Sequence, residues 1–143
     1  MTEQVNITRT IHISAGLAWA AISGIGGLDR WFPIISACTV SGEGVGAIRI
    51  LTLADGEEMQ DVIEEIDHQQ QRLRYRRTKS PFPVSSYVGT VDIRESGPHA
   101  AEIIWIVEMK PNENCPADFS ELIYTAISDG INGMEQELLN ASA

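Results

Sequence analysis

The stretch at residues 45–67, VGAIRILTLADGEEMQDVIEEID, contains two apolar runs separated by the turn sequence ADGE. Runs of this kind on either side of a glycine-containing turn are typical of a β-hairpin. Arg49 lies within the first run and Asp61 within the second. The stretch therefore predicts two antiparallel strands, and the question it raises is which way these two charged side chains point.

The faces of the two predicted strands leave two interpretations open. Side chains two residues apart on a strand project to the same face, so Arg49 shares its face with Leu51 and Leu53, and Asp61 shares its face with Ile63. A buried guanidinium needs a carboxylate, a ligand anion or water beside it. Either the arginine face is the inner one and Asp61 is the partner, or this face is solvated and the neighbouring isoleucines form the core.

The segment before this hairpin predicts one strand and two short helices. Residues 4–13 alternate between apolar and polar side chains, as a half-buried strand does. Ser14 can cap a helix that Gly24 and the glycines after it terminate. Residues 28–32 can form a second short helix, which Pro33 ends.

The rest of the chain predicts six more strands and one long helix. Between residues 34 and 111, β-branched and aromatic runs are separated by turn-rich segments, which favours antiparallel hairpins. Residues 119–139 carry apolar side chains at helical spacing. The predicted fold class is therefore α+β: a seven-stranded, curved antiparallel sheet around a long C-terminal helix. The sheet and the helix must pack together, and we expect a cavity for a small molecule between them.

Length and composition narrow the classes of function. The 143 residues fit a single domain, residues 1–143, which can bury about two-thirds of its unfolded surface. Cys38 and Cys115 match no metal or redox spacing and predict free thiols. The net charge of -10 opposes binding to nucleic acid and to anionic lipid. Because neither a signal peptide nor a membrane span is recognisable, we expect a soluble, cytoplasmic protein.

Other motifs predict neither a metal nor a cofactor. His12 lies on the polar face of the first strand, and His68 and His99 lie in turns, so three histidines would not converge on a metal. The segment GEGVG lacks the lysine and the helix of a phosphate-binding loop. The acidic residues between positions 57 and 65 lack the loop of oxygen ligands that calcium needs.

The order of elements and several spaced residues resemble the START/Bet v1 superfamily and, within it, bacterial proteins of the polyketide cyclase/dehydrase group. That resemblance covers almost the whole chain and implies the helix-grip fold with an internal cavity. It rests on Trp31, Pro33, Tyr75, Trp105 and Gly130 and on the segments GAIRILTL, IEEID and PVSSY.

A second, more distant resemblance is to the plant abscisic-acid receptors of the same superfamily. An ungapped alignment places their pocket glutamate on Asp61 and two pocket aromatic residues on Tyr75 and Tyr87, and their pocket arginine falls on Arg49. Their ligand-anchoring lysine falls on Ser36, and their gate and latch sequences are replaced. This resemblance therefore implies a cavity with Arg49 and Asp61 pointing into it, without the hormone signalling.

These inferences define a set of expected ligand-binding residues. Arg9 interrupts an isoleucine face and either reaches the cavity or its mouth, or has a structural role. Trp31 and Trp105 are large enough to anchor the core. Small residues on the last helix would leave room for a ligand, unless the helix packs closely with no void. The expected set is Arg49, Leu51, Asp61, Ile63, Tyr75, Tyr87, Trp105, Leu122, Ala126 and Gly130, with Ile123 and Ile127 beside them.

Two main function classes remain open. In the first, the protein binds a hydrophobic small molecule of lipid, polyketide or aromatic type. In the second, it is a polyketide cyclase or dehydrase, where Arg49 holds an enolate oxygen, Tyr75 or Tyr87 donates a proton and Asp61 is a base whose pKa is raised by burial. A protein-interaction module is a third alternative, and an edge strand leaves a homodimer open.

Overall fold

One antiparallel sheet and one long helix dominate the computed structural model, which describes residues 2–142. Two short helical segments follow the first strand, and the remaining strands come in sequence before the long helix, as predicted. The elements are β1 (Glu3–Ile11), α1 (Ala15–Ser23), the 3-10 helix η1 (Leu28–Arg30), β2 (Ile35–Ser41), β3 (Ile48–Leu53), β4 (Glu58–Asp67), β5 (Arg72–Lys79), β6 (Val84–Gly97), β7 (Ala100–Pro111) and α2 (Phe119–Ser142).

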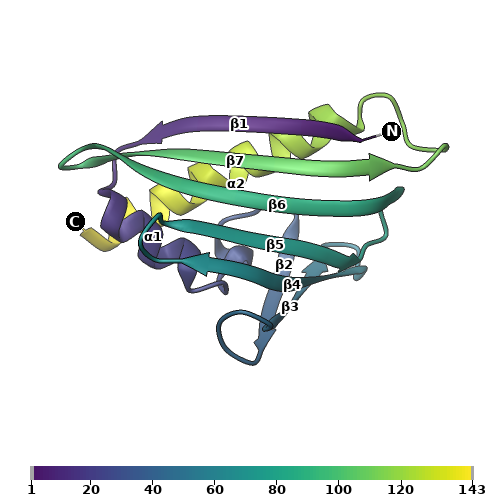
Figure 1. Ribbon diagram of the computed structural model, residues 1–143, viewed down its shortest axis with the longest axis horizontal. Helices are drawn as coiled ribbons and strands as arrows, with labels where there is room; N and C mark the ends of the chain where they lie inside the picture. The colour runs from purple at the N-terminus through teal and green to yellow at the C-terminus, as the bar shows by residue number, and fades with distance from the viewer. Residues whose placement is uncertain (1, 143) are drawn as a thin grey trace.

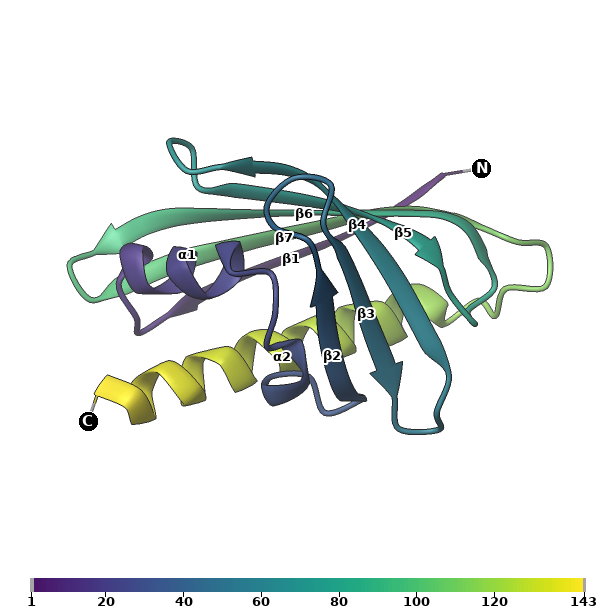
Figure 2. The ribbon, with the colours of Figure 1, turned by 90° about the horizontal axis from the view of Figure 1, so that it is seen from below.

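The strands of the sheet follow the order β1-β7-β6-β5-β4-β3-β2. Each strand from β2 to β6 pairs with the next strand along the chain, and β1 pairs with β7. Figure 1 shows β1, β7 and β6 side by side with α2 behind them, and Figure 2 shows α2 along one face of the sheet, with β2 and β3 crossing its direction. The predicted helix-grip fold is confirmed.

The two short helical segments differ in how closely they follow the prediction. Ser14 caps α1 as expected, because its Oγ accepts a hydrogen bond from the Leu17 backbone N–H at 3.3 Å. The second segment is one 3-10 turn that ends at Arg30, and is shorter than the predicted helix over 28–32. Pro33 disfavours helical backbone at Phe32, which accounts for the early end.

Helix α2 presents an apolar stripe to the sheet and a close contact to η1. Ile123, Ile127, Ile131 and Met134 are buried along the helix. Gly133 lies against the Trp31 carbonyl group so closely that a Cβ atom at this position would overlap it. A glycine is therefore required where the segment after η1 crosses the helix. Within residues 2–142, none of the helices has both the length and the apolar character needed to cross a membrane.

A β-bulge between β4 and β5 sets the position of Arg77 relative to Asp61. Gln60 lies opposite Lys79 and Asp61 lies opposite Arg77, so Thr78 is an extra residue on β5. An extra residue in one strand bends that strand and changes the direction of its side chains. Here the bulge places Arg77 directly across from Asp61.

Candidate functional site

Three charged residues form a row across three neighbouring strands of the sheet. Arg49 on β3 lies opposite Asp61 on β4, and Asp61 lies opposite Arg77 on β5. The side chains of Arg49 and Asp61 are 2% and 0% exposed, and that of Arg77 is 9% exposed. Arg49 therefore faces inward together with Leu51 and Leu53, whose buried side chains belong to the core, and the alternative of a solvated arginine face does not hold.

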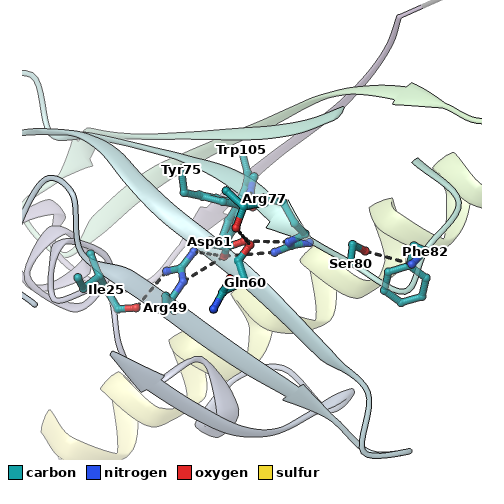
Figure 3. A network of polar contacts seen from close by, with 10 residues as sticks. Ile25, Arg49, Gln60, Asp61, Tyr75, Arg77, Ser80, Phe82 and Trp105 are labelled. Carbon is teal, nitrogen blue, oxygen red and sulfur yellow. Dashed lines mark hydrogen bonds and ion pairs between the residues drawn. The ribbon is translucent and has the colours of Figure 1, made fainter. Parts of the chain in front are cut away.

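Both arginines bind the same carboxylate (Figure 3). Arg49 donates from Nε and Nη2 to Oδ2 of Asp61, at 3.2 and 2.9 Å. Arg77 donates from Nε to Oδ1 at 2.9 Å and from Nη2 to Oδ2 at 3.4 Å. The Nη1 group of Arg49 donates to the Ile25 carbonyl oxygen at 3.0 Å, which ties β3 to the segment after α1. The carboxylate of Asp61 thus has both oxygens occupied by charged donors.

The protonation of Asp61 corrects one expectation. Burial would raise the pKa of the Asp61 carboxyl, but the charges of Arg77 and Arg49 and the hydrogen bonds they donate outweigh burial and hold this pKa below its usual range. The prediction that burial raises it is therefore wrong. An ionised carboxylate with both oxygens bound is poorly suited to take a proton from a substrate.

Aromatic rings separate this cluster from β7. The guanidinium carbon of Arg49 lies 4.9 Å from the centroid of the Tyr75 ring, and that of Arg77 lies 4.4 Å from the centroid of the Tyr87 ring. The indole Nε1 of Trp105 donates to the Tyr75 hydroxyl oxygen at 3.1 Å. Burial raises the pKa of both tyrosines, so both phenols remain protonated.

A cavity of about 260 Å³ lies between the sheet and α2, beside the charged row. Its wall consists of aliphatic and aromatic residues apart from Arg77, and Tyr75, Tyr87 and Trp105 are the aromatic wall residues that carry a polar group. The lining residues are Leu28, Phe32, Ile34, Ile35, Leu51, Met59, Tyr75, Arg77, Phe82, Tyr87, Trp105, Phe119, Leu122, Ile123, Ala126 and Ile127.

Most of the expected ligand-binding residues lie on this wall, and four do not. Arg49 and Asp61 are buried next to the wall without lining it, and Ile63 is a core residue. The space beside Gly130 is filled by the Phe32 ring, so this glycine serves packing rather than leaving room for a ligand. The expected residues that line the cavity are Leu51, Tyr75, Tyr87, Trp105, Leu122 and Ala126, together with Ile123 and Ile127.

Two further candidates have structural partners instead of a place on the wall. Arg9 donates from Nη1 to the Asn132 side chain at 3.0 Å, which joins β1 to α2. Trp31 is buried, and its Nε1 donates to Glu137 at 3.0 Å. Trp31 therefore anchors the core as expected, and Arg9 has the structural role.

Arg77 is the polar wall residue that the sequence analysis missed. A signal for it was present, because Arg77 shares a strand face with Leu73 and Tyr75, both of which are buried. Four other cations on the same strand, Arg72, Arg74, Arg76 and Lys79, concealed that alternation. Leu28, Phe32, Ile34, Ile35, Met59, Phe82 and Phe119 were also not anticipated as wall residues.

The histidines lie away from the cavity. The Nδ1 atom of His68 accepts a hydrogen bond from the Trp19 indole at 3.0 Å, and the His12 backbone N–H donates to Glu135 at 2.7 Å. Across residues 2–142 the structure contains no group of three or more His, Cys, Asp and Glu side chains that could hold a metal ion.

Comparisons with known proteins agree with this architecture. Residues 2–138 match the family model for polyketide cyclase / dehydrase and lipid transport proteins. No curated protein matches the sequence.

Solved structures with the same fold come from bacteria and a plant. The protein XoxI of Bacillus cereus has a TM-score of 0.86 at 23% identity, with 98% of each chain covered. The Zhui aromatase/cyclase of a Streptomyces species has a TM-score of 0.81 at 15% identity, covering 100% of this chain and 97% of that one. Norcoclaurine synthase of Thalictrum flavum has a TM-score of 0.80 at 18% identity, with coverages of 97% and 87%. At these identities the likeness shows the shared fold alone.

Proposed function

Because this chain belongs to the polyketide cyclase / dehydrase and lipid transport family, we propose that it binds a hydrophobic small molecule in the cavity between the sheet and α2. The observation that carries the proposal is the cavity of about 260 Å³ with its aliphatic and aromatic wall. Ligand sites in proteins are commonly concave, mostly apolar and furnished with a few polar groups. A protein-interaction module is expected to have an interior filled by side chains, without a cavity of this size.

The wall also supplies an entrance. Ile34 and Leu122 line the cavity, yet they are 44% and 56% exposed. Apolar side chains that touch both solvent and the cavity mark its mouth, between the segment before β2 and the start of α2. A hydrophobic ligand can enter there without unfolding of the sheet.

The test of binding blocks the cavity from the helix side. In an Ala126→Trp variant, the indole fills space that the alanine leaves open on the cavity wall. Titration calorimetry with the neutral probe N-phenylnaphthylamine should show saturable binding to the wild type and loss of binding to Ala126→Trp. Thr125→Trp is the matched control, because Thr125 is the exposed neighbour of Ala126 on α2.

Circular dichroism establishes that both variants are folded, and native mass spectrometry of the purified wild type identifies any molecule that remains bound. Undiminished binding of the probe to folded Ala126→Trp would refute the cavity as the binding site.

A second candidate function is a cyclase or dehydrase, and it is favoured by the donors on the wall. Arg77 and the Tyr87 phenol can stabilise negative charge that develops on a carbonyl oxygen. The lining residues include no Asp, Glu or His, and both Asp61 oxygens are occupied. Any catalysis would therefore depend on stabilising an enolate, with the proton taken up by the substrate itself or by water.

Turnover distinguishes the two candidate functions. A carrier binds a poly-β-keto thioester and releases it unchanged, as followed by chromatography and mass spectrometry. An enzyme converts it to a cyclised or dehydrated product, and this conversion should fall in Tyr87→Phe, which removes the donor and keeps the ring. Product formation above the uncatalysed rate would replace the carrier proposal with the enzyme.

A further inference from the structure

We propose that the ligand of this cavity carries one acidic group, such as a carboxylate, which binds at Arg77 while an apolar body fills the rest of the cavity. This inference rests on the proposed function, since it specifies the chemical class of the bound molecule. It follows from the charges beneath the cavity wall and from the position of one guanidinium.

The buried cluster carries an excess positive charge. Arginine stays protonated in proteins, so Arg49 and Arg77 contribute two positive charges against the single negative charge of Asp61. Their ion pairs are at 2.9 Å, and the three side chains are at most 9% exposed. A net charge removed from water is costly unless another charge is placed beside it.

The groups around the cluster compensate this charge only in part. The Ile25 carbonyl that binds Arg49 is a neutral dipole. The faces of the Tyr75 and Tyr87 rings attract the guanidiniums, but both rings are neutral. Burial raises the pKa of each phenol, so neither phenol supplies a negative charge. The remaining positive charge therefore favours an anion from outside.

Arg77 is the member of the cluster that an anion can reach. It lines the cavity, whereas Arg49 does not. Its bonds to Asp61 use Nε and Nη2, and the Tyr87 phenol is a further hydrogen-bond partner of the guanidinium, so an anion at this position would share the donor with Tyr87. The Tyr87 ring, 4.4 Å from the guanidinium carbon, lines the same part of the wall. An acidic oxygen beside Arg77 would therefore meet a charged donor with little competition from water.

The remainder of the wall limits how many acidic groups the ligand can carry. Apart from Arg77 and the tyrosines, the lining is aliphatic or aromatic. A second charged group would lie against apolar side chains with no partner, at a high cost in desolvation. The cavity thus suits a molecule with one acidic end.

The experiment compares two probes of nearly the same shape and different charge. Titration calorimetry at neutral pH measures the dissociation constants of β-naphthoate, an anion, and β-naphthamide, its neutral counterpart. The wild type should bind the naphthoate roughly tenfold more tightly, because hydrogen bonds to charged groups are about twice as strong as neutral ones. Equal affinities, or binding of N-phenylnaphthylamine without binding of either naphthalene probe, would overturn this inference and leave the proposed function intact, whereas failure of all three probes to bind would overturn the two together.

Two substitutions on the same strand assign the preference to one residue. Arg77→Met leaves a balanced pair of Arg49 and Asp61, and the ratio of the two dissociation constants should fall to about one. Arg76→Met is the matched control, because Arg76 is an exposed neighbour on β5 that pairs with Glu64, and its ratio should remain as in the wild type. Arg77→Lys retains the charge, so a folded Lys variant should keep most of the preference. A preference that persists in Arg77→Met, or one that is lost in Arg76→Met, would contradict the assignment.

Discussion

At the scale of single residues, Asp61 links Arg49 on β3 to Arg77 on β5 in the interior of the protein. It accepts hydrogen bonds from two guanidiniums, and one of these also holds the Ile25 carbonyl. The buried carboxylate and the two guanidiniums stabilise the fold only together, because any of these groups without its partner would be an isolated buried charge. The residue therefore matters more to the fold than its single charge suggests.

Asp61→Asn should destabilise the protein strongly. The substitution leaves two buried guanidiniums facing each other, and removal of one partner from a buried ion pair costs about 3–5 kcal/mol. Asp92→Asn is the control, because its ion pair with Arg72 is partly exposed and such pairs contribute about 1 kcal/mol or less. Urea unfolding measures both free energies. Similar losses for the two variants would show that the buried cluster is not a special source of stability.

The same carboxylate predicts how stability depends on pH. The pKa of Asp61 in the folded protein is below its ordinary value of 3.8, so its stabilisation is fully present above that value and is lost as the pH falls through the folded pKa. The free energy of unfolding should therefore decline below about pH 4. Carbon NMR of the Asp61 carboxyl group measures its titration directly, and a midpoint above 3.8 would contradict the prediction. Glu64→Gln, which removes an exposed carboxylate, should leave this titration in place.

At the scale of elements, the register of three strands assembles the site. The pairing of β3 with β4 sets Arg49 opposite Asp61, and the bulge in β5 sets Arg77 opposite Asp61 from the other side. On the next strand, Gly89 lies opposite Tyr75. A Cβ atom at residue 89 would overlap the Tyr75 ring. The missing side chain on β6 is therefore what allows Tyr75 to cross this strand and reach Trp105.

Gly89→Ala should displace the Tyr75 ring. Overpacking of a well-packed interior costs about 1–3 kcal/mol, and the hydrogen bond from Trp105 would be lost. Denaturant unfolding measures the stability, and Trp fluorescence reports the altered surroundings of the indole. Gly16→Ala is the control of opposite sign: no atom lies within 4 Å of the added Cβ in α1, so a gain of about 0.5–1 kcal/mol is expected from helix propensity. A neutral Gly89→Ala would mean that the ring can move without cost.

At the scale of the whole molecule, the charges outside and inside have opposite signs. The chain has a net charge of -10, while its buried cluster of two arginines and one aspartate has an excess positive charge. The cavity beside the cluster is enclosed by both the sheet and α2. A ligand in it would contact both layers, and would therefore bind the folded state and not the unfolded chain.

A ligand that binds in this way should raise the melting temperature. At a free concentration one hundred times its dissociation constant, it adds about 2.7 kcal/mol to the stability, which corresponds to roughly 5 to 10 °C for a chain of this length. Scanning calorimetry with the tighter-binding naphthalene probe measures the shift. Ala126→Trp should show little or no shift under the same conditions. An equal rise in that variant would place the probe on the surface.

Much of this architecture was accessible from the sequence because its signals are local. Alternation along residues 4–13, turn segments such as ADGE and the helical spacing after residue 119 each depend on neighbours a few positions away. The pairing of Arg49 with Asp61 was accessible for the same reason, since one short turn joins their strands. These features needed no knowledge of distant contacts.

The sequence by itself determined the order of the elements and the packing of an antiparallel sheet on a long C-terminal helix, because strand and helix periodicities and short turns specify them, whereas burial in the folded chain chose between the two faces open to Arg49. Only the tertiary structure decided that Arg77 joins Asp61, that Phe32 fills the space beside Gly130, and that Arg49 lies next to the cavity and not on its wall. The physical reason is that a bulge, a ring packed on a distant glycine and the balance of charges around one carboxylate depend on strands and helices that meet only in the folded chain.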